Sequence, residues 1–168
     1  DHIICISDIA EKKLREYMGG EWTNPSSEKY NRISTINNGV DVEAIHNAVP
    51  DAKLMAVKEG RMAILMVAGF RDAKDQDAIV RALSLLDKNK YEVWFAGIGE
   101  RQETVKELAI RLGVADRVRF LGLRNDIPNV LKAADIIVMS SHCEGSWLTN
   151  IEAMAAAQGI DFLAPLLP

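Results

Sequence analysis

The sequence predicts an α/β fold built on a doubly wound parallel sheet. From residue 60 onward, apolar runs of strand length alternate with longer segments in which apolar residues recur at helical spacing. Four such strand and helix pairs fit into about 100 residues, and right-handed crossovers between parallel strands are the usual result of such alternation. The composition agrees, because 48% apolar and 26% charged residues are typical of a globular protein. A chain of 168 residues has room for one domain, or for one domain and a fragment of another.

The four strands are predicted from continuous apolar stretches, the pattern of parallel strands that are covered on both faces. They are expected at residues 62–68, 91–96, 117–121 and 135–139. A helix is expected after each strand. The apolar positions that indicate the first two helices are Ile79, Leu83 and Leu86, and then Val105, Leu108, Ala109 and Leu112. A brief helix follows Asp126, and an Ala-rich helix is expected over residues 148–157.

The first 60 residues are organised differently. Residues 2–7 are typical of a strand, and Asp8 with Glu11 resembles the capping box that opens a helix. The apolar stripe of this helix is expected to comprise Ala10, Leu14, Tyr17 and Met18. The polar, turn-rich segment 19–31 is typical of a linker, and residues 34–36 are expected to form a short strand.

Charge, hydropathy and cysteine usage exclude several classes of protein. The net charge of −4 argues against a nucleic-acid-binding surface, which is normally basic. The longest apolar run has seven residues, whereas a membrane-spanning helix needs about 20, so we expect at most peripheral contact with a membrane. Asp1 and His2 lack the features of a signal peptide. Cys5 and Cys143 are too few for a disulfide scaffold, which predicts a reducing compartment, the cytoplasm.

Ligands of such sheets bind beyond the carboxyl ends of the strands, which directs attention to the loops after each strand. Glu144 and Glu152 are eight residues apart around the predicted start of the last helix, with Ser146 as its candidate N-cap. The free N–H groups of a helix start suit a phosphate, and carboxylates can accept hydrogen bonds from sugar hydroxyls. From spacing alone, two solvated surface glutamates remain the alternative.

Two further loops carry candidate ligand-binding residues. Lys74 and Arg71 follow the first predicted strand and could reach a diphosphate, although two ordinary surface cations would give the same pattern. Gly97 and Gly99 follow the second strand, but Gln102 stands where a dinucleotide fingerprint needs its third glycine, so a tight turn is the simpler interpretation. We expect no metal site, because the consecutive residues 142–144 are poorly spaced to share one ion.

In order along the chain, these segments resemble the retaining glycosyltransferases of family 4, which have the two-domain GT-B architecture. The resembling stretches are CIS at 5–7, INNGVD at 36–41, VAGFRDAKDQD at 67–77, AGIGERQETVKELA at 96–109, RVRFLGLRNDIPNVLKAADIIVMSS at 117–141 and EGSWLTNIEAMA at 144–155. The resemblance implies that residues 1–18 are a remnant of the acceptor-binding N-terminal domain. Residues 19–32 would then be a linker, and residues 33–168 a Rossmann-like donor-binding domain that is incomplete at its C-terminal end.

The resemblance also implies a role for each candidate site residue. Glu152 would bind the ribose hydroxyls and Glu144 the donor sugar. The diphosphate would be held by the side chain of Lys74 and by backbone amides of Ser146, Trp147, Leu148 and Thr149. The base pocket would be formed by Gly97, Gly99, Leu123, Arg124, Asn125 and Ile127. The family usually has an arginine at the position of Gly69, and Arg71 is the candidate replacement. Trp147 stands where the family usually has a glycine.

The function implied is the transfer of a sugar from a UDP- or GDP-sugar to a glycan or lipid-linked acceptor, with retention at the anomeric carbon. Glu144 and Lys74 would be the catalytic residues, and no cofactor or metal would be needed. The acceptor would be bound by an N-terminal domain that this chain lacks, so we expect the chain to be inactive alone. Two alternatives are a nucleotide-sugar epimerase of GT-B fold and a non-catalytic nucleotide-binding module.

Overall fold

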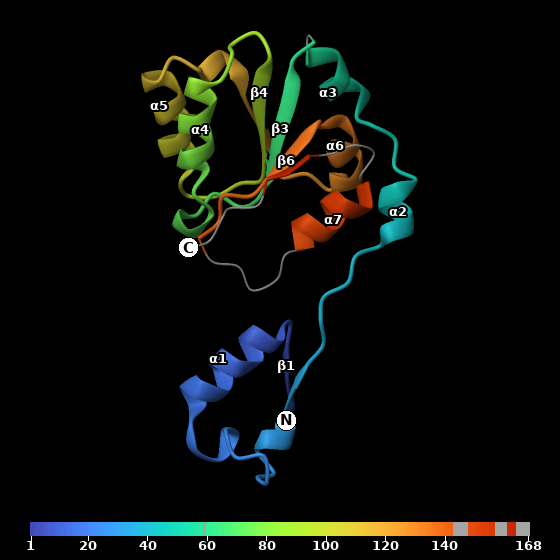
Figure 1. The fold of residues 1–168 in the computed structure, drawn as a ribbon, viewed down its shortest axis with the longest axis vertical. Coiled ribbons are helices and arrows are strands. Elements are labelled where there is room, and N and C mark those ends of the chain that lie inside the picture. Colours follow the sequence, from blue (N-terminus) through green and yellow to red (C-terminus); the bar gives the residue numbers. More distant parts are fainter. Residues whose placement is uncertain (59, 143–147, 157–160, 164–168) are drawn as a thin grey trace. The chain divides into compact units, whose positions relative to one another are not determined.

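The computed structural model describes residues 1–58, 60–142, 148–156 and 161–163, with side chains up to residue 156. The chain forms two compact units, the first comprising residues 1–40 and the second beginning at Asp41 (Figure 1). No helix within the described residues is long and apolar enough to cross a membrane.

The first unit is a two-stranded parallel sheet and one helix. Strand β1 (Ile3–Cys5) pairs with β2 (Ile33–Thr35), and helix α1 (Asp8–Met18) follows β1. Two single-turn 3₁₀ helices, η1 (Gly20–Trp22) and η2 (Tyr30–Arg32), lie between α1 and β2.

Helix α1 differs from the sequence prediction at its start and on its apolar face. The N-cap is Ser7, whose Oγ accepts a hydrogen bond from the Ala10 amide at 3.2 Å, so Asp8 and Glu11 do not form the predicted capping box. The Glu11 carboxylate instead accepts hydrogen bonds from Arg15 and from Oγ1 of Thr35. Tyr17 is 89% exposed and is therefore not part of an apolar stripe. Helix α1 ends at Gly19, which adopts a φ of 60°.

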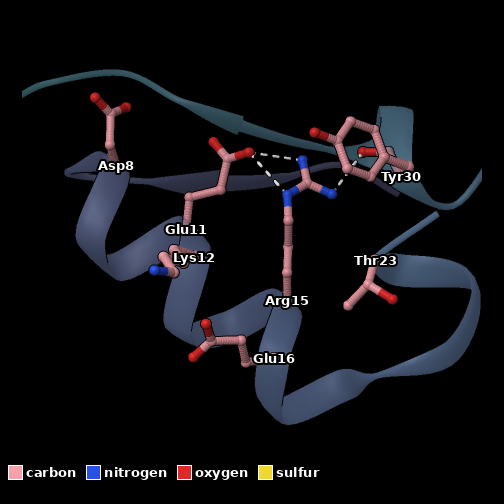
Figure 2. Close-up of a pocket in the computed structure, with 7 residues that line it drawn as sticks. All are labelled: Asp8, Glu11, Lys12, Arg15, Glu16, Thr23 and Tyr30. Atoms are coloured by element: carbon pink, nitrogen blue, oxygen red, sulfur yellow. Dashed lines mark hydrogen bonds and ion pairs between the residues drawn. The ribbon is translucent and has the colours of Figure 1, made fainter. Parts of the chain in front are cut away.

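Arg15 ties the segment between α1 and β2 to the helix. Its buried guanidinium donates to the carbonyl oxygens of Trp22, Tyr30 and Ile33, each at 3.0 Å, and stacks on the Tyr30 ring (Figure 2). The predicted linker is thus hydrogen-bonded into the first unit. Since β2 pairs with β1, the division between the two units falls after residue 40 instead of near residue 33.

The second unit is a five-stranded parallel sheet in the order β5-β4-β3-β6-β7. The strands are β3 (Met62–Val67), β4 (Tyr91–Ala96), β5 (Val118–Gly122), β6 (Ile136–Val138) and β7 (Asp161–Leu163). The four strands predicted from apolar runs are confirmed within one or two residues at each end. The edge strand β7 was not predicted, because three residues are too few to show a strand pattern in the sequence.

Helices cover both faces of this sheet (Figure 1). Helices α4 (Gln76–Leu85) and α5 (Gln102–Arg111) lie on one face, and α3 (Ala52–Val57), α6 (Ile127–Ala133) and α7 (Leu148–Ala156) on the other. The doubly wound α/β prediction is therefore confirmed. Helices α3 and the short α2 (Val42–His46) were not predicted, since five or six residues are too few to show a helical period.

The main hydrophobic core lies between the sheet and helices α4 and α5. It includes Val93 and Phe95 of β4, Leu83 of α4 and Leu108 of α5. Side chains that alternate with these along β4 point to the opposite face. One of them is Glu92, fully buried, whose carboxylate accepts hydrogen bonds from Nε1 of Trp94 and from Arg119. Parallel strands buried on both faces fix the loops at their carboxyl ends, where ligands bind in such folds.

Candidate functional site

A pocket of about 250 Å³ opens at the carboxyl ends of β3, β4 and β5. It is lined by residues 67–69 and 96–98 and by Leu123, Arg124 and Ile127. Leu123 and Ile98 are 70% and 57% exposed, so the pocket has an apolar rim. Gly97, Leu123, Arg124 and Ile127 thus lie together, as the family resemblance implies. Gly99 and Asn125 are not among the residues that line the pocket.

No side chain fits at Gly97 or Gly99, because two loops contact each other there through their backbones. A Cβ on Gly97 would lie 2.1 Å from the carbonyl oxygen of Ala68, and one on Gly99 would lie 2.4 Å from that of Phe70. The same loops are joined by a hydrogen bond from the Phe70 amide to the Ile98 carbonyl at 3.1 Å. Gly97 also has a φ of 149°, which side chains rarely allow. Backbone packing therefore requires glycine at both positions, whether or not a ligand binds.

The loop between β5 and α6 is held by ion pairs around Arg124. The guanidinium donates to both carboxylate oxygens of Asp126, at 2.7 and 2.6 Å, and to Oδ2 of Asp51 at 2.5 Å. These contacts lower the pKa of Asp126 and raise the pKa of Arg124. The pKa of Asp51 is also lowered, first by the hydrogen bond from the Leu54 amide and then by Arg124. Sequence analysis missed Asp51, because nothing in the pattern of residue 51 indicates a partner 73 positions later.

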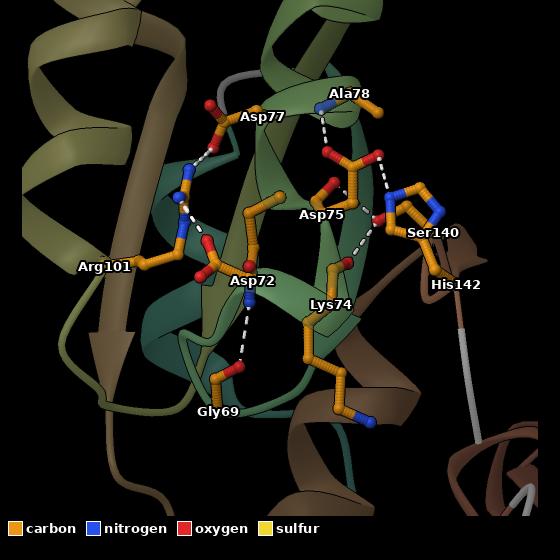
Figure 3. Close-up of polar contacts among 10 residues, drawn as sticks. Gly69, Asp72, Lys74, Asp75, Asp77, Ala78, Arg101, Ser140 and His142 are labelled. Atoms are coloured by element: carbon orange, nitrogen blue, oxygen red, sulfur yellow. Dashed lines mark hydrogen bonds and ion pairs between the residues drawn. The ribbon is translucent and has the colours of Figure 1, made fainter.

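Lys74 is half-buried at the end of a 3₁₀ turn, Asp72–Lys74, beyond β3. Its backbone is fixed by the Ser140 hydroxyl, which donates to the carbonyl oxygens of Lys74 and Asp75, both at 2.8 Å (Figure 3). Figure 3 shows the Lys74 side chain extending away from these contacts. The loop after β6 thereby sets the position of the Lys74 backbone.

Arg71 is exposed at the start of the same turn. Its Nε lies 3.9 Å from the point that a Cβ on Gly69 would occupy. The Arg71 side chain therefore passes over the place where a side chain at position 69 would begin. The Gly69 carbonyl accepts a hydrogen bond at 3.0 Å from Nε2 of Gln76, whose side chain is buried.

Asp75 joins the loop of Lys74 to helix α4 and is unusual in its backbone. It adopts a left-handed φ of 48°, which no other non-glycine residue of the described chain shares. Its Oδ1 caps α4 by accepting from the Ala78 amide, and its Oδ2 lies 3.1 Å from Nε2 of His142 (Figure 3). Neither the left-handed conformation of Asp75 nor its contact with His142 was predicted.

Helix α7 carries Glu152, and its first turn approaches β3. The Thr149 hydroxyl donates to the Val67 carbonyl at 3.5 Å, and Leu148 is half-buried. Glu152 is half-buried too, and burial raises the pKa of its carboxyl above the ordinary 4.5 without any compensating partner among the described residues. Glu144, Ser146 and Trp147 lie outside the described residues. Among the residues described, no group of His, Cys, Asp and Glu could hold a metal ion.

A family of proteins described as glycosyl transferases group 1 matches residues 52–158. The sequence is 32% identical over 133 residues to the UDP-Gal:alpha-D-GlcNAc-diphosphoundecaprenol alpha-1,3-galactosyltransferase of Escherichia coli, covering 74% of this chain and 34% of that protein. It is 30% identical over 161 residues to an uncharacterized glycosyltransferase of Methanocaldococcus jannaschii, covering 90% and 40%. The chain thus spans between a third and two fifths of the length of these curated relatives.

Solved structures share the fold at low sequence identity. WaaG, a glycosyltransferase involved in lipopolysaccharide biosynthesis, superposes with a TM-score of 0.75 at 20% identity, over 95% of this chain and 42% of that one. Anabaena HepE, in complex with UDP and glucose, gives 0.74 at 20% identity, over 95% and 43%.

Proposed function

The chain belongs to the group 1 glycosyl transferases, and from this membership we propose that it is the donor-binding part of a retaining glycosyltransferase. The whole protein would transfer a sugar from a UDP- or GDP-sugar to a glycan or lipid-linked acceptor. The observation that carries the proposal is the pocket at the carboxyl ends of β3, β4 and β5, with Lys74 farther along the loop that follows β3. Residues that follow three different strands line this one pocket, at the edge of the sheet where ligands bind in such folds.

Each part of the donor has a proposed partner. The base would enter the pocket against the apolar rim of Ile98 and Leu123. The ribose hydroxyls would donate to the Glu152 carboxylate. Lys74, aided by Arg71, would hold the diphosphate, and Glu144 would orient the sugar. The complex of HepE with UDP and glucose supports this kind of donor.

The chemistry proposed is stabilisation of the leaving diphosphate. As the bond between sugar and diphosphate breaks, negative charge grows on the phosphate oxygens. A fixed cation such as Lys74 stabilises that charge most where it develops. Because Ser140 holds the Lys74 backbone, little reorganisation would be needed during the reaction. The backbone amides of residues 146–149 would add donors at the start of α7. The scheme needs no metal ion.

The acceptor and the cellular site are also part of the proposal. The acceptor would be bound by a further domain, since the chain spans only part of its relatives' length, and closure of two domains would bring acceptor and donor together. We place the reaction in the cytoplasm, as the cysteine content predicts.

A calorimetric screen of UDP- and GDP-sugars against the full-length protein tests the proposal. Binding of one nucleotide sugar, followed by transfer to a glycan or lipid-linked acceptor with retained anomeric configuration in the NMR spectrum, is the expected result. A panel of UDP, GDP, ADP and NAD in a thermal-shift assay is the control. Preference for NAD, or indifference to all four, would overturn the proposed donor.

A further inference from the structure

Arg124 lines the pocket, and its guanidinium is held by two carboxylates that lie at very different distances along the chain. Asp126 is two residues away in the same loop and accepts hydrogen bonds from the guanidinium through both carboxylate oxygens. Asp51 is 73 residues away and accepts from Nη2 through Oδ2. Asp126 belongs to the same loop as Arg124, whereas Asp51 anchors Arg124 to the start of helix α3.

Asp51 is itself firmly placed. Its Oδ1 caps helix α3 by accepting from the amides of Lys53 and Leu54, at 2.9 and 3.1 Å. Its own amide donates to the carbonyl of Asn129 in α6 at 3.1 Å. The two carboxylate oxygens of Asp51 therefore bind different partners: Oδ1 caps the helix, and Oδ2 accepts a hydrogen bond from Arg124. The side chains of Asp51 and Arg124 are only 13% and 24% exposed, so solvent screens this pair less than a surface pair.

The charge balance of this cluster bears on what the pocket accepts. Two carboxylates face one guanidinium, so the wall as a whole is not cationic. A free arginine would be a strong ligand for phosphate, since its fork matches phosphate geometry. Nε and Nη2 of Arg124 donate to Asp51 and Asp126. Because the two carboxylates outweigh its single positive charge, Arg124 presents a fixed side chain to the pocket within a cluster that has no net positive charge.

We propose that Asp51 is a positioning residue that holds Arg124 in a wall without net positive charge and thereby directs the base, not the diphosphate, into the pocket. The inference rests on the proposed function and deepens it, because it explains which end of the nucleotide enters. The diphosphate is left to the loop of Arg71 and Lys74, which lies at the end of β3.

The substitution Asp51→Asn tests this role with little damage to the fold. Asparagine caps a helix about as well as aspartate, so its oxygen can keep the bonds to the α3 amides while its NH₂ group faces the guanidinium. The matched control is Asp41→Asn, since Asp41 caps α2 through the Ala44 amide and is exposed, with no ion pair among the described residues. Calorimetry on the full-length protein would use the nucleoside, the nucleoside diphosphate and inorganic pyrophosphate, for whichever base the unmutated protein prefers.

We expect Asp51→Asn to weaken the nucleoside and the diphosphate by the same factor, about three- to tenfold, as couplings within one ion-pair network do. Pyrophosphate should bind as before or more tightly. In a protein that already carries Arg124→Gln, Asp51→Asn should not weaken the binding of the nucleoside any further. Equal affinities for the nucleoside in the Asp51 and Asp41 variants would overturn the inference while leaving the proposed function intact. Failure of the unmutated protein to bind either UDP or GDP would overturn the proposed function, and this inference with it.

Discussion

The carboxylate of Asp75 lies 3.1 Å from Nε2 of His142 and caps helix α4 with its other oxygen. The His142 amide also donates to the Ala73 carbonyl at 2.9 Å. Together with the Ser140 hydroxyl, these contacts join the loop after β6 to the loop that carries Lys74. Two loops that approach from different strands are thus held together by short polar contacts, and Asp75 is central to them.

Because Asp75 has both a capping role and a left-handed backbone, its substitutions should follow a particular order of stability. Asparagine tolerates this conformation and still caps, glycine tolerates it without capping, and alanine does neither. We expect Asp75→Ala to cost about 1–3 kcal/mol of unfolding free energy, from the lost cap and the left-handed strain. Asp75→Gly should cost clearly less, and Asp75→Asn least. Denaturant unfolding measures all three.

The control for this order is Asp41, which caps α2 with an ordinary φ of −79°. The difference in unfolding free energy between the alanine and glycine variants should be smaller at position 41 than at position 75. If the two positions gave the same difference, backbone strain at Asp75 would play no part. His142→Ala should change stability by less than about 1 kcal/mol, because the histidine is 70% exposed.

Lys74→Ala should weaken nucleoside diphosphates and leave the bare nucleoside almost unaffected. The lost charge would face phosphate, and charge-assisted hydrogen bonds contribute about 1.5–3 kcal/mol, which is roughly a ten- to a hundredfold change in affinity. Calorimetry with UDP or GDP and the corresponding nucleoside measures the two effects. Lys88→Ala, an exposed lysine far along the chain from the pocket loops, is the control. An equal loss for nucleoside and diphosphate would show that Lys74 acts through folding.

Arg71→Ala tests whether this arginine replaces the one that the family carries at position 69. We expect weaker binding of the diphosphate, with no change for the nucleoside. A Cβ on Gly69 would lie 3.4 Å from the Ile98 carbonyl, an ordinary contact, so Gly69→Arg can be built. Adding Gly69→Arg to Arg71→Ala should restore part of the lost affinity, because both side chains start beside the same point. Unchanged affinity in Arg71→Ala would make Arg71 a plain surface residue.

Gly97→Ala and Gly99→Ala should destabilise the fold regardless of any ligand. Their Cβ atoms would overlap carbonyl oxygens of the neighbouring loop, and overpacking of this kind costs about 1–3 kcal/mol or more. Gly39→Ala is the control, since nothing lies within 4 Å of its Cβ position. Thermal unfolding without nucleotide is the measurement. Full stability of the Gly97 variant would contradict the close approach of the two loops.

The strands and the longer helices could be predicted because each carries its own periodic signal. The runs at β3 and β4 are apolar throughout, and α4 and α5 repeat apolar residues at helical spacing. Gly97, Leu123 and Arg124, which line the 250 Å³ pocket, were named together through the family resemblance. The contacts that hold the pocket could not be predicted, because Asp51 and Arg124, or Asp75 and His142, are far apart in sequence and each is an ordinary polar residue by itself.

The N-terminal segment shows the same limit. The composition of residues 19–31 is that of a linker, yet the carbonyl groups of this segment are bound by Arg15 from the preceding helix. A single buried arginine can order a polar segment by supplying several donors at once. No local pattern at residue 15 distinguishes it from a surface arginine, so the prediction of a linker and of a domain boundary near residue 33 had no means of including it.

Glu152 offers a test in which stability and binding should change in opposite directions. Burial raises its pKa in the folded protein above the value of 4.5 that it has when solvated. The folded state then favours the protonated carboxyl. The stability that this gives is fully present below the unfolded pKa and is lost as the pH rises through the folded pKa. At neutral pH the charged, half-buried carboxylate therefore destabilises the unliganded protein.

Glu152→Gln removes this charge and keeps the size of the side chain. The variant should be more stable than the unmutated protein at pH 7.5, and the difference in unfolding free energy should shrink toward zero below about pH 4, where the glutamate is protonated as well. Paired denaturant titrations at several pH values give this difference directly, because other acid-sensitive groups are common to both proteins. A glutamine variant that is less stable at pH 7.5 would contradict the burial penalty.

The same variant should bind nucleotide less well, if the carboxylate accepts hydrogen bonds from both ribose hydroxyls. Loss of a charge-assisted contact predicts a decrease of roughly 1–3 kcal/mol in the binding of UDP or GDP to the full-length protein. The 2′-deoxy nucleotide should bind weakly to the unmutated protein and lose little more on mutation, so the two changes would not be additive. A coupling energy near zero between the mutation and the 2′-hydroxyl would remove Glu152 from the ribose site. A glutamate kept at a cost in stability and coupled to one hydroxyl of the ligand is a binding residue, because a purely structural residue would show neither effect.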